Sequence, residues 1–496
     1  MTGRLLAAAL ALIVAVPSLS ARGQDASASR LRADLDRIFD DPVLARALVA
    51  ARVDSLGPRG ASDGPGRVVY ARNAERLAVP ASNMKLFTIA AAADALGWSY
   101  RYETRLEAAG TIAAGTLTGD LIVVGSGDPS IGTPDDGHAS LFLEWAEAIR
   151  RAGIQRISGR IVGDDDAFED EGLGTGWAWD NLASGYSAPV GALNFNENAV
   201  VARISPAAAA GGEPSVTLGP DGHGLALHAE LVTGPAGSAV DLAFFRTPGT
   251  SALTLRGSVP AAGGVVMRTA AVDNPTLFFV EAFRRALAAR GITVEGGAAD
   301  IDTVTSRPPA AGRRTIAVHT SPPFSVLAGY AMKASQNMYA EVFLKTLGRA
   351  AANEGTAKAG LTAVRDRLAA WGVPMSGLVL LDGSGLSRYN YLTASAIVSL
   401  LTHIWTTESL RGPFVAELPV AGQDGTLDLR MRGTALARNV QAKTGTLSNV
   451  RALSGYVARP DGEKLVFSIL VNHYTAPNAV VDAIVERALE RLMDGD

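Results

Sequence analysis

Residues 80–85 read Pro-Ala-Ser-Asn-Met-Lys and lead into a long apolar stretch. The periodicity predicts a helix from Ser82 to about Leu96, because apolar side chains recur on one face and Gly97 suits the C-cap. Residues three apart on a helix share a face, so Lys85 can reach the hydroxyl of Ser82. The stretch therefore predicts a serine hydroxyl and a lysine ammonium side by side at the start of a helix.

Two further short motifs follow in chain order. Ser335-Gln336-Asn337 is a Ser-x-Asn, and Lys443-Thr444-Gly445-Thr446 is a Lys-Thr-Gly with a following threonine. Taken singly, the three motifs have ordinary explanations as a helix cap, an interhelical turn and a strand edge. Together and in this order they indicate a serine active site.

The chemistry of such a site explains the residue types. A serine hydroxyl is a poor nucleophile until a base takes its proton, and a lysine serves as that base only if its pKa falls. We expect burial beside a second cation, Lys443, to lower the pKa of Lys85. Ser335 would relay a proton. At a helix N-terminus, the backbone N–H of Ser82 can stabilise an oxyanion.

The remaining motif residues suit substrate binding. Asn337 would hold a substrate amide. Lys443, with the hydroxyls of Thr444 and Thr446, would bind a carboxylate, and Gly445 would let the substrate backbone approach closely. The sequence thus predicts acyl transfer through a serine ester.

The composition excludes several other classes of protein. The chain has 496 residues, 48% hydrophobic and 19% charged, enough for a large core and more than one domain. Lys and Arg number 45 against 49 Asp and Glu, which argues against binding to nucleic acid or a polybasic attachment to membranes. The chain has no cysteine and its six histidines form no His-Glu-x-x-His, so we expect neither metal nor cofactor.

Residues 1–23 predict a secretory signal. Arg4 precedes an apolar run of 12 residues from Leu5 to Val16, which Pro17 ends before a group of small residues. The run is shorter than the roughly 20 residues that span a bilayer, and no later stretch is long enough. We therefore expect an exported protein that is soluble after removal of the signal.

The order of predicted elements indicates a domain formed by both chain ends around a β-rich insertion. Short strands and turns dominate from about 105 to 310, apart from a helix that starts at Asn274-Pro275 and ends at Gly291. Elsewhere the sequence predicts helices at 34–40, 42–50 and 479–493, two helices that meet near Ser335, and strands at 68–70, 440–446, 451–457 and 464–471.

At its motifs the chain resembles the penicillin-recognising serine enzymes. More narrowly, it is similar to the penicillin-binding-protein-4 type (class C low-molecular-mass) D-alanyl-D-alanine carboxypeptidase/endopeptidases. The resemblance is carried by residues 80–85, 333–337, 339–341, 382–388, 418–422, 424–427 and 443–446. Ser82 and Ser335 are 253 positions apart, and in the family this gap holds two extra domains, one nested in the other.

The resemblance implies an α+β fold, in which a β-lactamase/transpeptidase-like domain with an antiparallel sheet flanked by helices carries a large β-rich two-domain insertion. The expected boundaries are 1–23 for the signal, 30–105 and 312–496 for the penicillin-binding domain, 106–198 and 271–311 for the inserted domain, and 199–270 for the nested insertion.

The resemblance also implies roles for individual residues. Ser82 would be the nucleophile, Lys85 the general base, Ser335, Asn337 and Lys443 the rest of the catalytic set, and Thr444, Gly445 and Thr446 substrate contacts, with an oxyanion hole from the N–H groups of residues 82 and 446.

The family selects the side chain of the stem peptide with a carboxylate, an aromatic and an arginine. The best matches here are Asp164, Phe168 and Arg388. Two alternatives stay open: residues 164–166 as a solvated acidic turn, and Arg388 as a partner in a surface ion pair.

The implied function is that of a periplasmic serine D-Ala-D-Ala carboxypeptidase that acts on the stem peptides of peptidoglycan and is acylated by β-lactam antibiotics. D,D-endopeptidase activity is an open addition. The alternatives are a β-lactamase or esterase on the same scaffold and a catalytically inactive wall-binding protein. No nucleic acid and no membrane span are expected, and the oligomeric state is left open.

Overall fold

The computed structural model describes residues 19–57, 66–132 and 140–494. Most of the predicted signal segment 1–23 lies outside the described residues, and its removal stays a prediction. Within the described ranges, no helix combines the length and the apolar character needed to cross a membrane.

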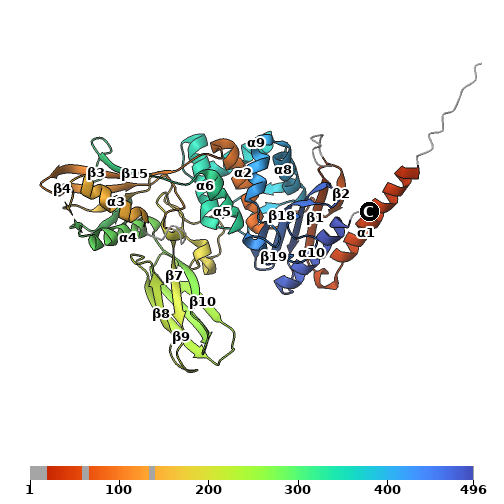
Figure 1. The fold of residues 1–496 in the computed structure, drawn as a ribbon, viewed down its shortest axis with the longest axis horizontal. Helices are drawn as coiled ribbons and strands as arrows, with labels where there is room; N and C mark the ends of the chain where they lie inside the picture. Colours follow the sequence, from red (N-terminus) through yellow and green to blue (C-terminus); the bar gives the residue numbers. More distant parts are fainter. Residues whose placement is uncertain (1–18, 58–65, 133–139, 495–496) are drawn as a thin grey trace, which may run out of the picture.

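Figure 1 shows an elongated molecule in which both ends of the chain lie in one half, here called the terminal half. A five-stranded antiparallel sheet forms its centre, in the order β18-β19-β20-β1-β2. The strands are β1 (Leu48–Ser55), β2 (Val68–Arg72), β18 (Val440–Leu447), β19 (Val450–Ala458) and β20 (Lys464–Asn472). The predicted α+β class is confirmed, and strands from both chain ends share this sheet.

Alternate residues of β1 face two separate hydrophobic cores. Ala50 packs with the helices on one side, whereas Val49 and Ala51 pack on the other side with α1 (Leu19–Phe39) and α10 (Asn478–Met493). Because helices cover both faces of the sheet, its central strands are nearly continuous in apolar residues.

Helix α2 (Met84–Leu96) runs through the middle of the helical layer. Every residue from Met84 to Ala93 is buried, Lys85 included, so the single apolar face predicted for this helix understates its burial. Gly97 ends the helix as predicted. The helices around it are α5 (Phe324–Lys333), α6 (Asn337–Ala352), α7 (Ala357–Ala370), α8 (Ala394–Thr406) and α9 (Glu408–Glu417).

The helix predicted at 42–50 is wrong. Asp41 does cap a turn, accepting a hydrogen bond from the N–H of Val43 at 3.1 Å, but that turn ends at Leu44. From Leu48 the chain forms β1. Pairing with β2 on one edge and β20 on the other outweighs the local preference for a helix.

The second half, here called the inserted half, is built on a seven-stranded sheet. Its order is β13-β5-β4-β3-β15, with β6 and β14 paired beside β4. The strands are β3 (Glu103–Ala113), β4 (Thr116–Val124), β5 (Arg156–Ile157), β6 (Ile161–Asp164), β13 (Thr293–Val294), β14 (Ala298–Asp300) and β15 (Arg314–Thr320). Since β15 pairs with β3, residues 314–320 lie in this sheet. The domain boundaries stay predictions.

Helices α3 (Ser140–Arg151) and α4 (Pro275–Ala289) pack on this sheet. Helix α4 begins as predicted, with the Asn274 side chain accepting from the N–H of Leu277 at 2.7 Å. Helix α3 lies in a stretch where only strands and turns were predicted.

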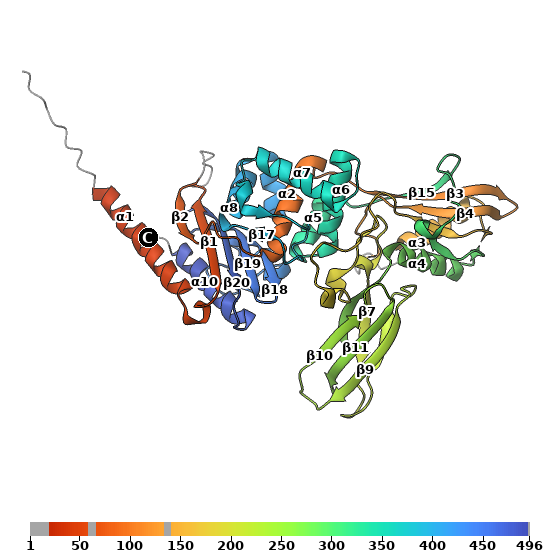
Figure 2. The same cartoon turned by 180° about the vertical axis from the view of Figure 1, so that it is seen from behind.

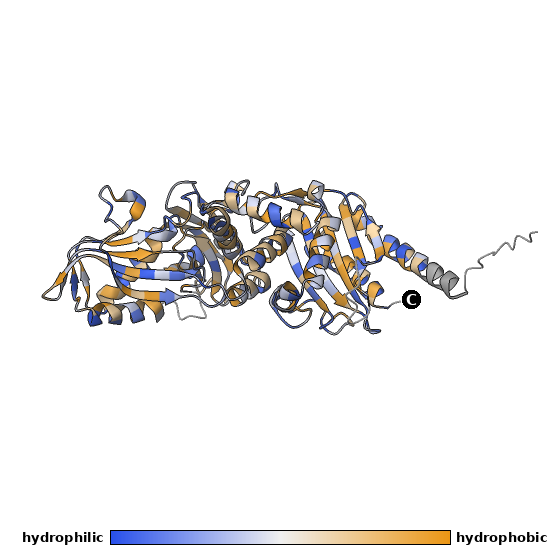
Figure 3. Cartoon of the chain, turned by 90° about the horizontal axis from the view of Figure 1, so that it is seen from above, coloured by the Kyte–Doolittle hydropathy of each residue, from blue (hydrophilic) through white to orange (hydrophobic). Residues whose placement is uncertain are grey.

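Burial alternates along β3, and Figure 3 shows hydrophobic and hydrophilic residues interleaved on this sheet.

A separate β module projects from the long axis of the molecule (Figures 1 and 2). It pairs its strands in two sheets, β12-β7-β8 and β10-β11-β9. The strands are β7 (Ala199–Ser205), β8 (Ser215–Gly219), β9 (Ala226–Gly234), β10 (Asp241–Arg246), β11 (Ala252–Pro260) and β12 (Val266–Ala271).

Residues 165–198, here called the connecting segment, join β6 to this module. The segment carries the short 3₁₀ turns η4 (Trp179–Asn181), η5 (Gly185–Ser187) and η6 (Asn196–Asn198). Turn η5 contacts α6, so the inserted half reaches the helical layer of the terminal half.

Candidate active site

Ser82 lies in a short 3₁₀ turn, η2 (Ala81–Asn83), directly before α2. The predicted helix start is thus a tight turn, and Lys85 follows in the first turn of α2. Ala81 has a φ of +46°, a conformation that residues with a Cβ rarely adopt. Such strained backbone is held only where the surroundings enforce it, and here it fixes the direction of the serine.

Two glycines allow other segments to pack closely on this turn. A Cβ on Gly385 would lie 1.8 Å from the carbonyl oxygen of Ala81, and one on Gly445 would lie 2.6 Å from that of Pro80. We expected Gly445 to make room for the substrate backbone. Its position gives a different reason for a glycine here, because β18 packs closely against the turn that carries Ser82.

Lys85 is fully buried and makes contact with three oxygen atoms. Its Nζ is 3.1 Å from the Oγ of Ser82 and donates to the Oδ1 of Asn337 at 2.6 Å and to the carbonyl of Ser384 at 2.9 Å. Burial lowers the pKa of Lys85 to about 7, although the charges of two carboxylates raise it. Burial is therefore the main cause of the lowered pKa, as expected, whereas the expected contribution of Lys443 is not among its causes.

Ser335 and Lys443 form a second pair. Ser335 lies between α5 and α6 with a φ of +58°, and its Oγ accepts a hydrogen bond from the Nζ of Lys443 at 2.8 Å. Burial and then the charge of Lys85 lower the pKa of Lys443 well below its usual value. The predicted role of Lys443, supplying positive charge to a substrate carboxylate, stays a prediction.

Two buried carboxylates, Glu341 and Asp382, have charges that act on Lys85. Glu341 accepts hydrogen bonds at 2.8–3.1 Å from the backbone N–H groups of residues 383–384, and Asp382 accepts two more from the same loop. Burial and then the charge of Asp382 raise the pKa of Glu341 to about 7. The loop they hold carries the carbonyl of Ser384, to which Lys85 donates.

A cleft of about 500 Å³ opens over Ser82. The predicted site residues on its wall are Ser82, Ser335, Asn337, Thr444, Thr446 and Arg388. Residues 178, 181 and 186 of the connecting segment also line it, so both halves of the molecule contribute to the cleft.

Hydroxyl groups and one arginine lie along the β18 side of the cleft. The hydroxyl of Thr444 donates to that of Thr426 at 2.7 Å. The oxygen of Thr446 accepts a hydrogen bond from Arg451, which leaves the proton of this exposed hydroxyl for a ligand. Arg388 donates to the carbonyl of Ser448 at 2.6 Å. On this wall Thr446 and Arg388 are therefore the donors placed for a carboxylate, while the Thr444 proton is donated to Thr426.

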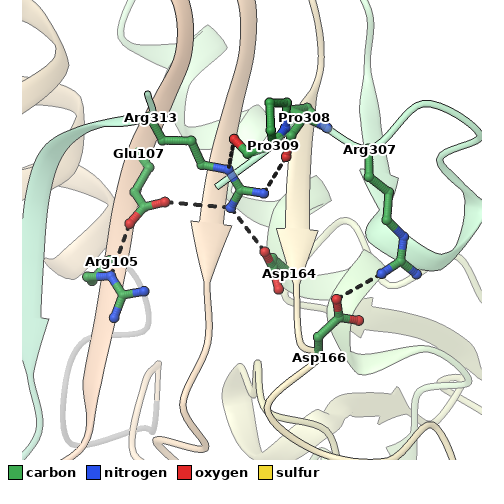
Figure 4. A network of polar contacts seen from close by, with 8 residues as sticks. All are labelled: Arg105, Glu107, Asp164, Asp166, Arg307, Pro308, Pro309 and Arg313. Carbon is green, nitrogen blue, oxygen red and sulfur yellow. Dashed lines mark hydrogen bonds and ion pairs between the residues drawn. The ribbon is translucent and has the colours of Figure 1, made fainter. Parts of the chain in front are cut away.

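Residues 164–166 are not among those that line the cleft, and Figure 4 shows Asp164 and Asp166 directed toward arginines. Asp164 pairs with Arg313 at 3.1 Å, and Asp166 pairs with Arg307 at 2.8 Å. Phe168 is 5% exposed and packs in the core around α2. Of the three residues predicted to select the substrate side chain, only Arg388 lies at the cleft.

Asp165, between the two ion-paired aspartates, has different surroundings. Burial raises the pKa of Asp165 to about 7, and its carboxylate accepts a hydrogen bond from Thr276. One of its carboxylate oxygens lies within 4.8 Å of one oxygen of Asp300 and one of Asp302. The expectation that the protein uses neither metal nor cofactor stays a prediction.

Several residues at the site had no role in the sequence-based prediction. The carbonyl of Tyr186 accepts a hydrogen bond from the Nδ2 of Asn337 at 2.8 Å. Glu341 and Asp382 lie in stretches that resemble the family, but no catalytic spacing pointed to them. The contact of Asn337 with Tyr186 spans 151 positions, so a local pattern carries no signal for it.

Comparison with known proteins identifies the family of the chain. The family model described as "D-Ala-D-Ala carboxypeptidase 3 (S13) family" matches residues 31–491. A D-alanyl-D-alanine carboxypeptidase from Actinomadura sp. (strain R39) is 37% identical, covering 97% of this chain and 88% of that protein.

Solved structures show the same fold. Penicillin binding protein 4 of Haemophilus influenzae is similar, with a TM-score of 0.79 at 24% identity, covering 93% of this chain and 98% of that one. A second structure of that protein, complexed with a β-lactam, has a TM-score of 0.73, also at 24% identity, covering 93% of this chain and 99% of that one.

Proposed function

The chain belongs to the D-Ala-D-Ala carboxypeptidase 3 (S13) family of serine peptidases, and from this premise we propose that it removes the terminal D-alanine of peptidoglycan stem peptides through an acyl-enzyme on Ser82. The observation that carries the proposal is the contact between Lys85 and Ser82. A buried amine whose pKa is about 7 lies 3.1 Å from a serine hydroxyl at the floor of a cleft.

In the first step, Lys85 accepts the proton of Ser82 as the Oγ attacks the carbonyl carbon of the penultimate D-alanine. The C–N bond then breaks, the acyl group stays on Ser82 as an ester, and the terminal D-alanine leaves with a proton on its amine. Water attacks the ester in the second step, which releases the shortened peptide and returns the proton to Ser82.

Ser335 and Lys443 are placed to deliver the proton to the leaving amine. Their hydrogen bond of 2.8 Å connects the cleft wall to a buried lysine whose pKa is lowered, and such a lysine exchanges protons more readily than an ordinary one. Asn337 keeps Lys85 in place through its Oδ1. The N–H groups of Ser82 and Thr446 would form the oxyanion hole.

We assign recognition of the C-terminal carboxylate to the hydroxyls of Thr444 and Thr446, with the Thr444 proton turning from Thr426 to the carboxylate when the substrate binds. Both residues line the cleft, whereas the Nζ of Lys443 is directed to Ser335 and to the carbonyl of Thr444. Arg388 would bind a carboxylate on the side chain of the stem peptide, because it is the arginine on this wall.

Export to the periplasm follows from the apolar run at 5–16 and from the proposed substrate, which lies outside the cytoplasm. Acylation by β-lactams is supported by the complex that a relative forms with one.

Cleavage of crosslinks by the same acyl-enzyme stays a prediction. A crosslinked muropeptide dimer, incubated beside a D-Ala-D-Ala peptide, separates the two activities.

The decisive experiment measures the intact mass of the purified protein after incubation with benzylpenicillin. We expect one penicilloyl group on the wild type and on Ser395→Ala, a control serine outside the cleft, and none on Ser82→Ala. Ser82→Ala should also release no D-alanine from a D-Ala-D-Ala peptide while it unfolds at an unchanged temperature. Labelling of a folded Ser82→Ala protein would refute the assignment.

A further inference from the structure

Turn η6 of the connecting segment has an uncommon backbone. Asn196, Glu197 and Asn198 have φ values of 51°, 57° and 53°, so three residues with a Cβ follow one another in the left-handed region. Asparagine enters this region readily, but a glutamate does so rarely. Strained backbone of this kind persists only where the surroundings enforce it, and it concentrates at functional sites.

The asparagines of this turn are directed toward the inserted half. The Oδ1 of Asn198 accepts from the N–H of Phe195 at 3.1 Å, and its Nδ2 donates to the carbonyl of Pro189 at 2.9 Å and to Asn194 at 2.7 Å. The side chain of Asn196 donates to a backbone carbonyl three residues on. These bonds stabilise the left-handed turn from within.

Glu197 instead reaches the terminal half. One carboxylate oxygen accepts a hydrogen bond from the hydroxyl of Tyr330 on α5, and the other accepts from the Nε2 of Gln336 at 2.6 Å. Gln336 is the middle residue of the Ser-x-Asn motif. Its own Oε1 accepts from the N–H of Met338 at 3.0 Å and caps α6. Glu197 thus contacts the residue between Ser335 and Asn337.

The connecting segment makes a second contact with the same motif. Because the Nδ2 of Asn337 donates to the carbonyl of Tyr186, its Oδ1 is turned toward the Nζ of Lys85. A reversed amide would place two donors, the NH₂ group and Lys85, against each other. The carbonyl of Tyr186 therefore determines which end of Asn337 faces the general base.

We propose that Glu197 is a positioning residue for catalysis, holding the Ser335-Gln336-Asn337 motif from the inserted half so that Asn337 faces Lys85 and Ser335 faces Lys443. The inference rests on the proposed function, because it assigns Glu197 a part in forming the acyl-enzyme. Small displacements of catalytic groups have large effects on rate, so losing this contact should slow acylation about 10- to 100-fold.

The test compares the rate of acylation by benzylpenicillin, resolved into binding and bond formation, in the wild type, Glu197→Ala and Glu197→Gln. We expect Glu197→Ala to lower the rate constant of bond formation and to leave binding within about threefold. Glu197→Gln should restore most of the rate, since its amide oxygen can still accept from Gln336. Glu295→Ala, which removes a glutamate from an exposed ion pair in the same half, is the matched control and should acylate normally.

A double-mutant cycle with Gln336→Ala identifies the path of the effect. If Glu197 acts through Gln336, the double variant should be scarcely slower than the slower single variant. Multiplied losses, or acylation of Glu197→Ala at the wild-type rate, would overturn the inference. Should Glu197→Ala fail to fold, Glu197→Asp, which is too short to reach both partners, takes its place. A wild type that benzylpenicillin does not acylate at all would instead contradict the proposed function.

Discussion

Two groups of carboxylates, one in each half of the molecule, differ in their surroundings. Glu341 and Asp382 are buried and accept backbone N–H groups, whereas Asp164 and Asp166 pair with arginines and do not line the cleft. In the sequence, the acidic run at 164–166 is easier to notice than Glu341 and Asp382, which stand far apart. Yet it is Glu341 and Asp382 whose charges act on the catalytic base, Lys85. Burial alone does not make this difference, because burial also raises the pKa of Asp165 in the run. What distinguishes Glu341 and Asp382 is that their charges act on Lys85, in a place where water is excluded and charges interact strongly.

The largest effect should follow the loss of a buried carboxylate. Glu341→Ala leaves the N–H groups of residues 383–384 without their acceptor, and we expect it to lower the free energy of unfolding by about 3–5 kcal/mol. Urea unfolding measures this value, with Asp166→Ala as the control in the inserted half. A loss below about 1 kcal/mol for Glu341→Ala would remove the distinction between the two groups.

The pH dependence of acylation should show the influence of Glu341 on Lys85. Lys85 acts as a base only when neutral, so the rate should rise with pH through about 7 and be about 100-fold lower at pH 5 than at its plateau. The charge of Glu341 raises the pKa of Lys85, so Glu341→Gln should move this rise toward lower pH. Benzylpenicillin acylation from pH 5 to 9 measures it, and an upward shift would contradict the sign.

A smaller, substrate-dependent effect is expected at the cleft wall. Arg388→Ala should lower kcat/KM about 2- to 30-fold for peptides whose side chain carries a carboxylate, because it removes a charged hydrogen-bond donor. Peptides without this group and benzylpenicillin should react as before. Arg307→Ala, which loses an arginine that does not line the cleft, serves as the control. Equal losses on all substrates would show that Arg388 only supports the fold.

The smallest effect should come from the acidic run. Asp166→Asn breaks an ion pair between half-exposed side chains, which is worth less than about 1 kcal/mol. Asp164→Asn should leave kcat/KM within about twofold for peptides with and without an amine on the side chain. A loss confined to amine-bearing peptides would instead give Asp164 a role in specificity and break the comparison between the two groups.

Much of the fold was predictable where the signal is local. The cap at Asn274 and the break between α5 and α6 near Ser335 each depend on residues within a few positions. Residues 42–50 were not predictable in this way, because β1 depends on partners at both ends of the chain. Helix α3 was missed inside a stretch whose glycines and prolines suggested only strands and turns.

At the site, too, contacts between neighbouring positions could be predicted and contacts between distant positions could not. Ser82 and Lys85 were predicted to lie side by side because they are three positions apart on a helix. The structure places the Nζ of Lys85 3.1 Å from the Oγ of Ser82. Lys443 was recognised from its motif, but the burial that lowers its pKa depends on the whole fold and could not be predicted. The contact of Glu197 with Gln336 spans 139 positions, so only the folded chain reveals it.

The place of β1 in the sheet has a consequence for the order in which the chain acquires its structure during synthesis. Val79, three residues before Ser82, is hydrogen-bonded to Asn472 at the end of β20, across 393 positions. The sheet beside the nucleophile is therefore completed only when nearly the whole polypeptide has been made, whereas the sheet of the inserted half closes at β15. A chain that ends before β20 thus contains every strand of the sheet of the inserted half while its serine still lacks the strands that place it, and such a truncated product would lack activity.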